Sequence, residues 1–207
     1  MIDARVIYEY IKKYASLEDN VFCDLHKCAI PDKCNHKQNH CILNFDRVKD
    51  TYCSSKVITS YKSADGLTYN NNGILFVIEI KGWELYNKYS KPKTKQEVKE
   101  KVREYGLSVK LSDSLMICKD VLRGKGEISV PLVYLVVSDI KYEGVESIAS
   151  NLLLLAETSS SFSHIYGDEI KSQLSGIPDI DVGFVANCQE IDNELGLWTK
   201  ARQIQLV

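Results

Sequence analysis

The sequence contains no long uninterrupted run of apolar residues, and this absence excludes a helix that crosses a membrane. The longest runs, Ile74–Ile78 and Val130–Val137, fall far short of the ~20 residues that a membrane span requires. Proline and glycine are also scarce, with 4 and 11 among 207 residues, which excludes collagen-like and low-complexity proteins. The first residues are charged where a secretory leader has an apolar block, so we expect a cytoplasmic protein.

Nucleotide-binding motifs are absent as well. Neither G-x-x-x-x-G-K-[ST] nor G-x-G-x-x-G occurs, which argues against ATP hydrolysis and dinucleotide chemistry. Charge of one sign is not in excess, because 26 basic and 28 acidic side chains give a net charge of −2; this balance neither requires nor excludes a nucleic-acid partner. The chain is 44% hydrophobic and 26% charged, as folded domains are. We therefore expect one domain over residues 1–207.

Cysteine is abundant, and it is concentrated in one segment. Four of the seven cysteines lie within nineteen residues, together with three of the four histidines. Because intracellular thiols usually stay reduced, this cluster indicates a metal site within a loop-rich insert over residues 22–44. A structural zinc ion is the first interpretation, and free thiols, a disulfide or an iron–sulfur cluster are the alternatives. The candidate zinc ligands are Cys23, Cys28, Cys34, Cys41, His36 and His40.

Periodicity along the rest of the chain predicts the secondary structure. Helices are expected over Asp3–Ser16, from Thr94, over Ser112–Arg123, Gly144–Gln173 (with a break) and Glu190–Ala201, and strands over Lys56–Tyr61, Asp65–Tyr69, Ile74–Lys81, Val130–Ser138 and Asp181–Ala186. A run of strands followed by a crossover helix and a parallel strand is typical of a mixed sheet. The predicted class is therefore α/β, with a mixed central sheet flanked by helices.

Two carboxylates and a lysine converge in the predicted hairpin around Asn70–Gly73. Antiparallel pairing places Asp65 opposite position 78, within one residue of Glu79, and Lys81 lies on the same face as Glu79. These carboxylates, together with the backbone carbonyl of Ile80, are suitable ligands for Mg²⁺ or Mn²⁺. Such an ion polarises a phosphate and lowers the pKa of a bound water, which Lys81 can orient. The set therefore suits phosphodiester hydrolysis.

The spacing of Asp65, the hairpin, Glu79 and Lys81, with the element order αβββαβ, resembles the PD-(D/E)XK nuclease superfamily of restriction endonucleases, RecB-type nucleases and Holliday-junction resolvases. The similarity covers about Asp3–Ser138. It implies a restriction-endonuclease-like core, Asp65 and Glu79 as metal ligands, Lys81 as the catalytic lysine and DNA as the partner. It also allows a homodimer, because many nucleases that cut both strands act as dimers. Ala64 replaces the proline of the family motif, and the Cys/His-rich insert is not a general family feature.

A run of basic residues follows the hairpin. Residues 88–103 include seven basic and two acidic side chains, and such a patch can hold a phosphate backbone. The plainer interpretation is a solvated helix face. Plainer interpretations also exist for the carboxylates and the lysine. Glu79 and Lys81 could form a surface ion pair that contributes little to stability, and Asp65 could belong to an ordinary turn. The candidate substrate-binding residues are Lys91, Lys93, Lys95 and Lys99.

Two functions remain open at this point. The first is a deoxyribonuclease that depends on Mg²⁺ or Mn²⁺ and carries a zinc-bound insert. The second is a non-catalytic, zinc-stabilised module that binds nucleic acid or protein on a nuclease-like fold. Loss of the Glu79 carboxylate distinguishes them, because it abolishes cleavage only if the chain is an enzyme.

Overall fold

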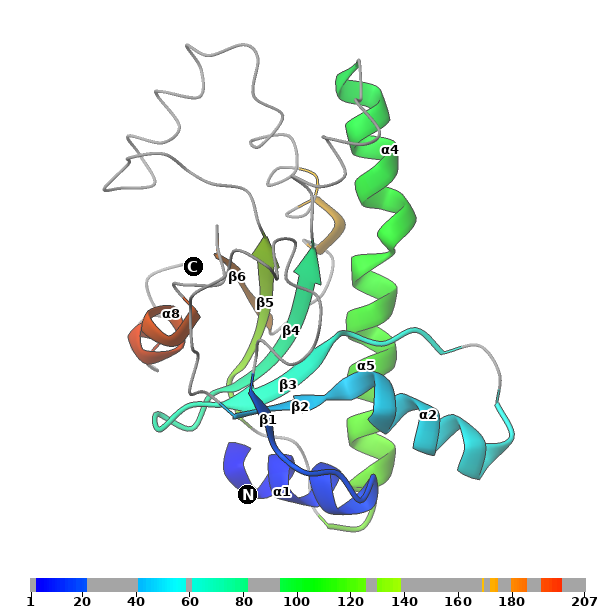
Figure 1. Ribbon diagram of the computed structural model, residues 1–207, viewed down its shortest axis with the longest axis vertical. Coiled ribbons are helices and arrows are strands. Elements are labelled where there is room, and N and C mark those ends of the chain that lie inside the picture. Colours follow the sequence, from blue (N-terminus) through cyan, green and yellow to red (C-terminus); the bar gives the residue numbers. More distant parts are fainter. Residues whose placement is uncertain are drawn as a thin grey trace.

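The computed structural model describes residues 3–21, 41–58, 61–81, 94–125, 130–138, 169, 172–174, 180–185 and 191–198. These residues form a mixed β-sheet with helices on its two faces (Figure 1). The α/β class with a mixed central sheet, expected from the sequence, is confirmed. In the described part of the chain, no helix combines the length and the apolar character that crossing a membrane demands.

The sheet has the strand order β1-β2-β3-β4-β5-β6. Its strands are β1 (Asn20–Val21), β2 (Cys41–Asn44), β3 (Gly66–Tyr69), β4 (Leu75–Lys81), β5 (Leu132–Ser138) and β6 (Ile180–Val185). Strands β1 to β4 pair antiparallel with their neighbours, whereas β4, β5 and β6 run parallel. Parallel neighbours need a crossover connection, and helices α4 and α5 supply it between β4 and β5.

Helix α1 (Ala4–Tyr14) confirms the first predicted helix. Asp3 is its N-cap, and the Asp3 side chain accepts a hydrogen bond from the Val6 backbone N at 2.8 Å, which satisfies one of the free N–H groups of the first turn. The buried stripe of the helix comprises Ala4, Ile7, Tyr8 and Ile11. This spacing of three and four residues turns one face of α1 toward the sheet.

The predicted strand over Lys56–Tyr61 is wrong. Lys56 ends helix α2 (Phe45–Lys56), which begins after the N-cap Asn44, and Val57 adopts a left-handed backbone with φ of 58°. Residues 57, 58 and 61 belong to no strand. The β-branched residues Val57 and Ile58 favour a strand locally. The residues before them form a helix because their buried side chains recur at helical spacing. The residues that α2 buries are Phe45, Val48 and Tyr52.

Strand β2 lies inside the segment predicted as a loop-rich insert. Its residues Ile42 and Leu43 are buried in cores on opposite faces of the sheet, and Cys41 is exposed at its start. The end of the predicted insert is therefore part of the sheet. The other candidate zinc ligands, Cys23, Cys28, Cys34, His36 and His40, lie outside the described residues, so the zinc site stays a prediction.

The hairpin between β3 and β4 forms around the predicted turn, with a register one residue away from the expected one. Tyr69 pairs with Leu75 and Gly66 with Ile78, so Asp65 lies opposite Glu79, whereas the sequence prediction placed Asp65 opposite position 78. The turn includes Ile74 because the Asn70 side-chain oxygen accepts a hydrogen bond from the Ile74 backbone N at 3.1 Å. Each residue of β3 therefore lies opposite a position one further along β4 than expected.

Two helices follow β4 and run end to end along one side of the sheet (Figure 1). Helix α4 (Lys95–Tyr105) begins at the predicted N-cap Thr94, whose hydroxyl accepts a hydrogen bond from the Glu97 backbone N at 3.2 Å. Helix α5 (Leu107–Val121) starts five residues before the predicted Ser112. Gly106 separates the two helices in a left-handed conformation, with φ of 60°, which a residue without a side chain adopts at low cost.

The sheet separates two apolar cores. Along β4, Phe76 and Ile78 pack in the core with helix α8 (Ile191–Leu197), and Leu75 and Val77 pack in the core with α1, α2, α4 and α5. The strand is thus buried on both faces, as its apolar run predicts. Because side chains alternate along a strand, Glu79 follows Val77 on the face that α5 covers.

Candidate active site

Asp65 and Glu79 lie opposite each other at the end of the hairpin. Gly66 pairs with Ile78 in the antiparallel register, so the next pair outward consists of the two carboxylate residues. The Asp65 backbone N donates to the Ile78 carbonyl at 2.9 Å, and Asp65 Oδ2 accepts from the Ile80 backbone N at 2.7 Å. Asp65 is 2% exposed and Glu79 is 0% exposed. The structure therefore brings two buried carboxylates together.

Two lysines neutralise these carboxylates. Lys81 forms an ion pair with Glu79 Oε1, and its ammonium lies 4.8 Å from the centre of the Tyr105 ring. Lys110 of α5 donates to the same Glu79 oxygen at 2.7 Å, and its Nζ lies 3.9 Å from Asp65 Oδ1. The cluster thus contains two negative and two positive groups.

Helix α5 holds the chain segment that leads into β3. The Ser114 hydroxyl oxygen accepts a hydrogen bond from the Ala64 backbone N at 2.9 Å, and the Asp113 carboxylate accepts one from the Lys62 backbone N at 2.9 Å. Ser114 is fully buried. These residues follow Lys110 by one helical turn, so one helix both carries a lysine of the cluster and fixes the approach to its first carboxylate.

Burial dominates the electrostatics of the cluster. It raises the pKa of Glu79 above its ordinary value, and the charge of Asp65 adds to this effect, whereas Lys81 and Lys110 oppose it. Burial also raises the pKa of Tyr134 on β5 well above 10, with the charges of Glu79 and Asp65 adding to the shift. Within the described residues, Glu79 Oε2 and the Tyr134 hydroxyl have no hydrogen-bond partner. Buried polar atoms without a partner are costly, so Glu79 Oε2 has capacity for a ligand.

The donor set fits a hard divalent cation. Asp65 and Glu79 supply carboxylate oxygens, and the Ile80 carbonyl points toward the same neighbouring strand as its N–H, which contacts Asp65. No group of three or more His, Cys, Asp or Glu suitable for a metal occurs in the described ranges. Water would complete the coordination shell, as it commonly does for Mg²⁺. Asp65, Glu79 and Ile80 thus remain the candidate ligands.

Lys110 was not predicted from the sequence. The predicted helix begins at Ser112, which leaves Lys110 in a loop. With the true start at Leu107, Lys110 falls beside the buried stripe that contains Leu107, Leu111 and Ser114. Lysines often lie beside a buried stripe, where the aliphatic part of the side chain covers apolar surface. The sequence therefore offers no signal that singles out Lys110.

The predicted substrate-binding lysines are described only in part. Lys91 and Lys93 lie outside the described residues, Lys95 is the first residue of α4, and Lys99 is partly buried one turn later. Two other basic residues of this helix are paired: Lys101 with Glu104 at 2.8 Å, and Arg103 with Glu169 at 2.7 Å. Contact of α4 with a phosphate backbone stays a prediction.

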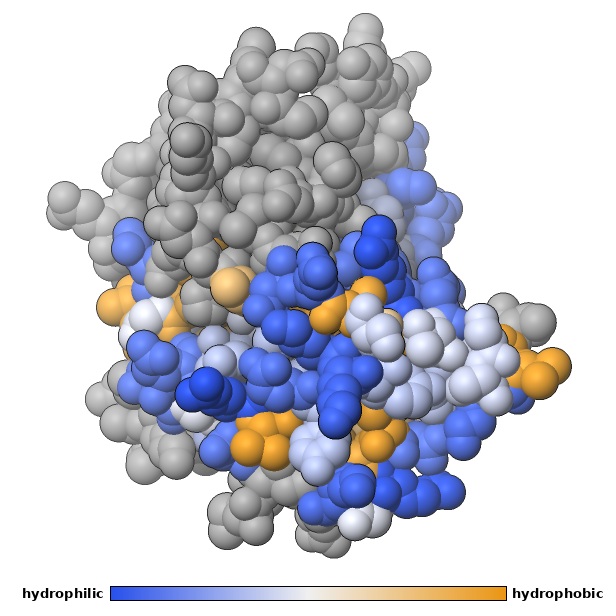
Figure 2. Space-filling model, turned by 60° about the horizontal axis from the view of Figure 1, so that its bottom comes forward, coloured by the Kyte–Doolittle hydropathy of each residue, from blue (hydrophilic) through white to orange (hydrophobic). Residues whose placement is uncertain are grey.

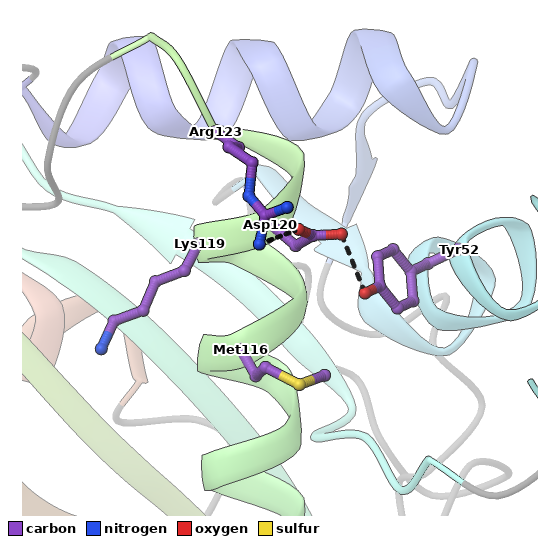
Figure 3. Close-up of a pocket in the computed structure, with 5 residues that line it drawn as sticks. All are labelled: Tyr52, Met116, Lys119, Asp120 and Arg123. Atoms are coloured by element: carbon purple, nitrogen blue, oxygen red, sulfur yellow. Dashed lines mark hydrogen bonds and ion pairs between the residues drawn. The ribbon is translucent and has the colours of Figure 1, made fainter. Parts of the chain in front are cut away.

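A separate pocket of about 360 Å³ lies between α2 and α5 (Figure 3). Inside it, Asp120 accepts a hydrogen bond from the Tyr52 hydroxyl at 3.0 Å and pairs with Lys56 and Arg123, each at 3.2 Å. The Tyr52 and Lys56 contacts lower the pKa of Asp120, and burial followed by Asp120 raises the pKa of Tyr52 to about 12. Asp120 is therefore already bound by neighbouring side chains of the same chain. The lining residues are Tyr52, Met116, Lys119, Asp120 and Arg123.

Among the coloured residues of the face turned forward in Figure 2, most are hydrophilic. Hydrophobic residues form only small, separate patches there. Large exposed hydrophobic side chains in the described ranges are also scattered over α1, the end of α2, α5 and α8: Val6, Tyr10, Val57, Val109 and Leu197. Single exposed apolar residues of this kind are ordinary surface features.

Comparisons with models of protein families, with curated proteins and with solved structures find no match to this chain. The relation to PD-(D/E)XK nucleases therefore stays a prediction. The evidence for a function is therefore the arrangement of Asp65, Glu79, Lys81 and Lys110.

Proposed function

We propose that this chain is a Mg²⁺- or Mn²⁺-dependent nuclease of the PD-(D/E)XK type that hydrolyses phosphodiester bonds of DNA. The observation that carries the proposal is the pair of buried carboxylates, Asp65 and Glu79, at the end of the hairpin with Lys81 on the same face. Burial of two ionised carboxylates is costly unless cations lie beside them. Lys81 and Lys110 already supply these cations, and a role in holding a metal ion accounts for the unpartnered Glu79 Oε2.

The order of elements supports the same proposal. Helix α1 precedes the antiparallel strands β2, β3 and β4, and α4 and α5 then lead to β5, which is parallel to β4. With β1 and α2 as additions, and with β2 in place of the strand wrongly predicted over Lys56–Tyr61, this order is compatible with the αβββαβ order that the resemblance implies. Asp65 directly precedes β3, and Glu79 and Lys81 lie on β4.

The proposed chemistry gives each residue of the site a task. Asp65, Glu79 and the Ile80 carbonyl would hold the metal ion, which when bound polarises the scissile phosphate and lowers the pKa of water. Lys81 orients the attacking water and stabilises the negative charge that develops on the phosphate oxygens. The attacking water loses a proton as its oxygen bonds to phosphorus, the bond from phosphorus to the leaving nucleotide oxygen breaks, and that oxygen gains a proton, so that one water molecule is consumed overall. The basic residues of α4 supply contacts to the DNA backbone.

A cleavage assay tests the proposal directly. The purified chain is incubated with end-labelled linear, single-stranded and branched DNA in Mg²⁺, Mn²⁺ or EDTA, beside Glu79→Gln and the control Asp50→Asn. Asp50 has an exposed side chain on α2, away from the proposed site, so the control keeps full activity. Glu79→Gln is expected to lower cleavage by about 100-fold or more, because it removes a metal ligand, while DNA binding in a gel-shift assay persists. Absence of metal-dependent cleavage by the folded protein, or equal cleavage by Glu79→Gln, refutes the proposal.

A second candidate function is favoured by one observation. The charges of Asp65, Glu79, Lys81 and Lys110 sum to zero without a metal ion, so the cluster can also stabilise a fold that binds nucleic acid or protein without cutting. This module predicts DNA or protein binding that needs no added Mg²⁺ or Mn²⁺, with no cleavage in either metal. The assay above separates the two functions.

A further inference from the structure

Lys110 occupies an unusual place on α5. Its neighbours Leu107, Leu111 and Ser114 are buried, and its own side chain is only 19% exposed. The ammonium lies 2.7 Å from Glu79 Oε1 and 3.9 Å from Asp65 Oδ1. It is therefore the one described cation with a recorded ion pair to both carboxylates.

Lys81 is placed differently from Lys110. Among the described residues its ion-pair partner is Glu79, and the Tyr105 ring lies 4.8 Å from its ammonium. A cation above an aromatic ring is stabilised without a carboxylate. Lys81 thus has a second favourable partner close to the site, whereas Lys110 is held by the pair of carboxylates that a shared metal ion would use.

A metal ion and the Lys110 ammonium make competing demands on these oxygens. The four side chains are already neutral together, so a divalent ion added to them would leave two excess positive charges in a buried site, which is costly. Glu79 Oε2 is completely buried and has no hydrogen-bond partner among the described residues, which leaves one oxygen ready for a ligand. A metal ion can contact Glu79 Oε1 and Asp65 Oδ1 only if an ammonium group moves away from these oxygens.

We propose that Lys110 is an internal competitor of the metal ion: its ammonium holds the place between Asp65 and Glu79, and a divalent cation binds there in exchange for it. Lys110 is thus a positioning residue that keeps the two carboxylates together in the metal-free protein and sets the concentration of metal at which the site fills. This inference rests on the proposed function only in that Asp65 and Glu79 bind a divalent ion.

Titration with Mn²⁺ tests the competition without any measurement of activity. Free Mn²⁺ is followed by electron paramagnetic resonance in the wild-type chain, Lys110→Met, Lys110→Gln and the control Lys119→Met. Lys119 is exposed on the same helix and has no recorded contact with the carboxylates. Removal of the competing charge is expected to tighten Mn²⁺ binding by about 5- to 150-fold, the usual range for coupling between two sites, whereas Lys119→Met leaves the affinity unchanged.

Unfolding in urea provides the second measurement. Without metal, Lys110→Met is expected to unfold at a lower urea concentration than the wild type, because two buried carboxylates lose a partner. Saturating Mn²⁺ then raises the midpoint more in the variant than in the wild type, since only the wild type must first displace its lysine. Lys110→Gln, whose amide can still donate a hydrogen bond to Glu79, keeps the test decisive if the methionine variant does not fold.

The outcomes separate this inference from the proposed function. Equal or weaker Mn²⁺ binding in the folded Lys110 variants overturns the competition, and so does a lack of Mn²⁺ binding in every protein. Cleavage of DNA that is lost in Glu79→Gln supports the nuclease whichever way the Lys110 result falls. Tighter Mn²⁺ binding in the Lys110 variants together with no cleavage by the wild type upholds the competition and refutes the nuclease.

Discussion

Substitution of Ser114 by alanine removes one of the two hydrogen bonds that anchor the segment leading into β3 to α5. The Ser114 hydroxyl oxygen accepts the Ala64 N–H at 2.9 Å, and both residues are 0% exposed. After the substitution the Ala64 N–H is buried without an acceptor, and an unsatisfied buried donor costs about 1–3 kcal/mol. We therefore expect Ser114→Ala to lower the free energy of unfolding by about 2 kcal/mol relative to a matched surface variant.

The matched variant is Ser112→Ala, an exposed position on the same helix. Alanine is the better helix former, and in either variant this gain is at most about 0.7 kcal/mol. The difference between the two variants therefore reports the hydrogen bond, with the gain in helix propensity largely cancelled. Urea denaturation followed by circular dichroism gives both free energies of unfolding. Equal stability of Ser114→Ala and Ser112→Ala would refute the argument that α5 anchors the approach to Asp65.

Two further predictions concern charge and the far end of the fold. Because burial and Asp65 raise the pKa of Glu79 above 4.5 in the folded protein, the folded state favours the protonated form, so the free energy of unfolding should fall as the pH rises from about 4.5 through the folded-state pKa. Urea denaturation at a series of pH values measures this decline, and the free energy of unfolding of Glu79→Gln should lack the part that Glu79 causes. If the difference in this free energy between Glu79→Gln and the wild type does not change with pH, Glu79 is not the cause. Asn70 donates to the Leu195 and Trp198 carbonyls at 2.9 and 3.0 Å and accepts from two backbone N–H groups of its own turn. Asn70→Ala should therefore cost about 3 kcal/mol at about 0.5–1.5 kcal/mol per bond, measured against the exposed control Asn71→Ala, and a loss as small as that of the control contradicts the role of these bonds.

Elements with strong local signals were predicted correctly from the sequence. Asp3 and Thr94 cap the helices that they were expected to begin, because a cap satisfies backbone groups through neighbouring residues alone. The apolar run of β4 and the turn that begins at Asn70 are likewise local properties. Each of these elements is defined within about ten residues of its own sequence.

The errors arise where distant contacts decide. Val57 and Ile58 have the composition of a strand, yet they directly follow helix α2. The packing of the buried residues of α2 in the core stabilises that helix. The hairpin register is the exception, because it depends on a local contact: the side-chain oxygen of Asn70 accepts a hydrogen bond from the backbone N of Ile74, four residues away. Lys110 joins the carboxylates only through the packing of α5 on the sheet, and spacing along the chain does not report such a contact.

The anchors of the site differ in how much chain they enclose, and this gives assembly an order. Asp65 contacts Ile80 across 15 residues, whereas the contacts of Lys110 with Glu79 and of Ser114 with Ala64 span 31 and 50 residues. Closure of longer loops costs more entropy, so the hairpin with its two carboxylates is the cheaper part to form. Chain order points the same way, because Lys110 is the last of the four charged residues of the cluster to be synthesised.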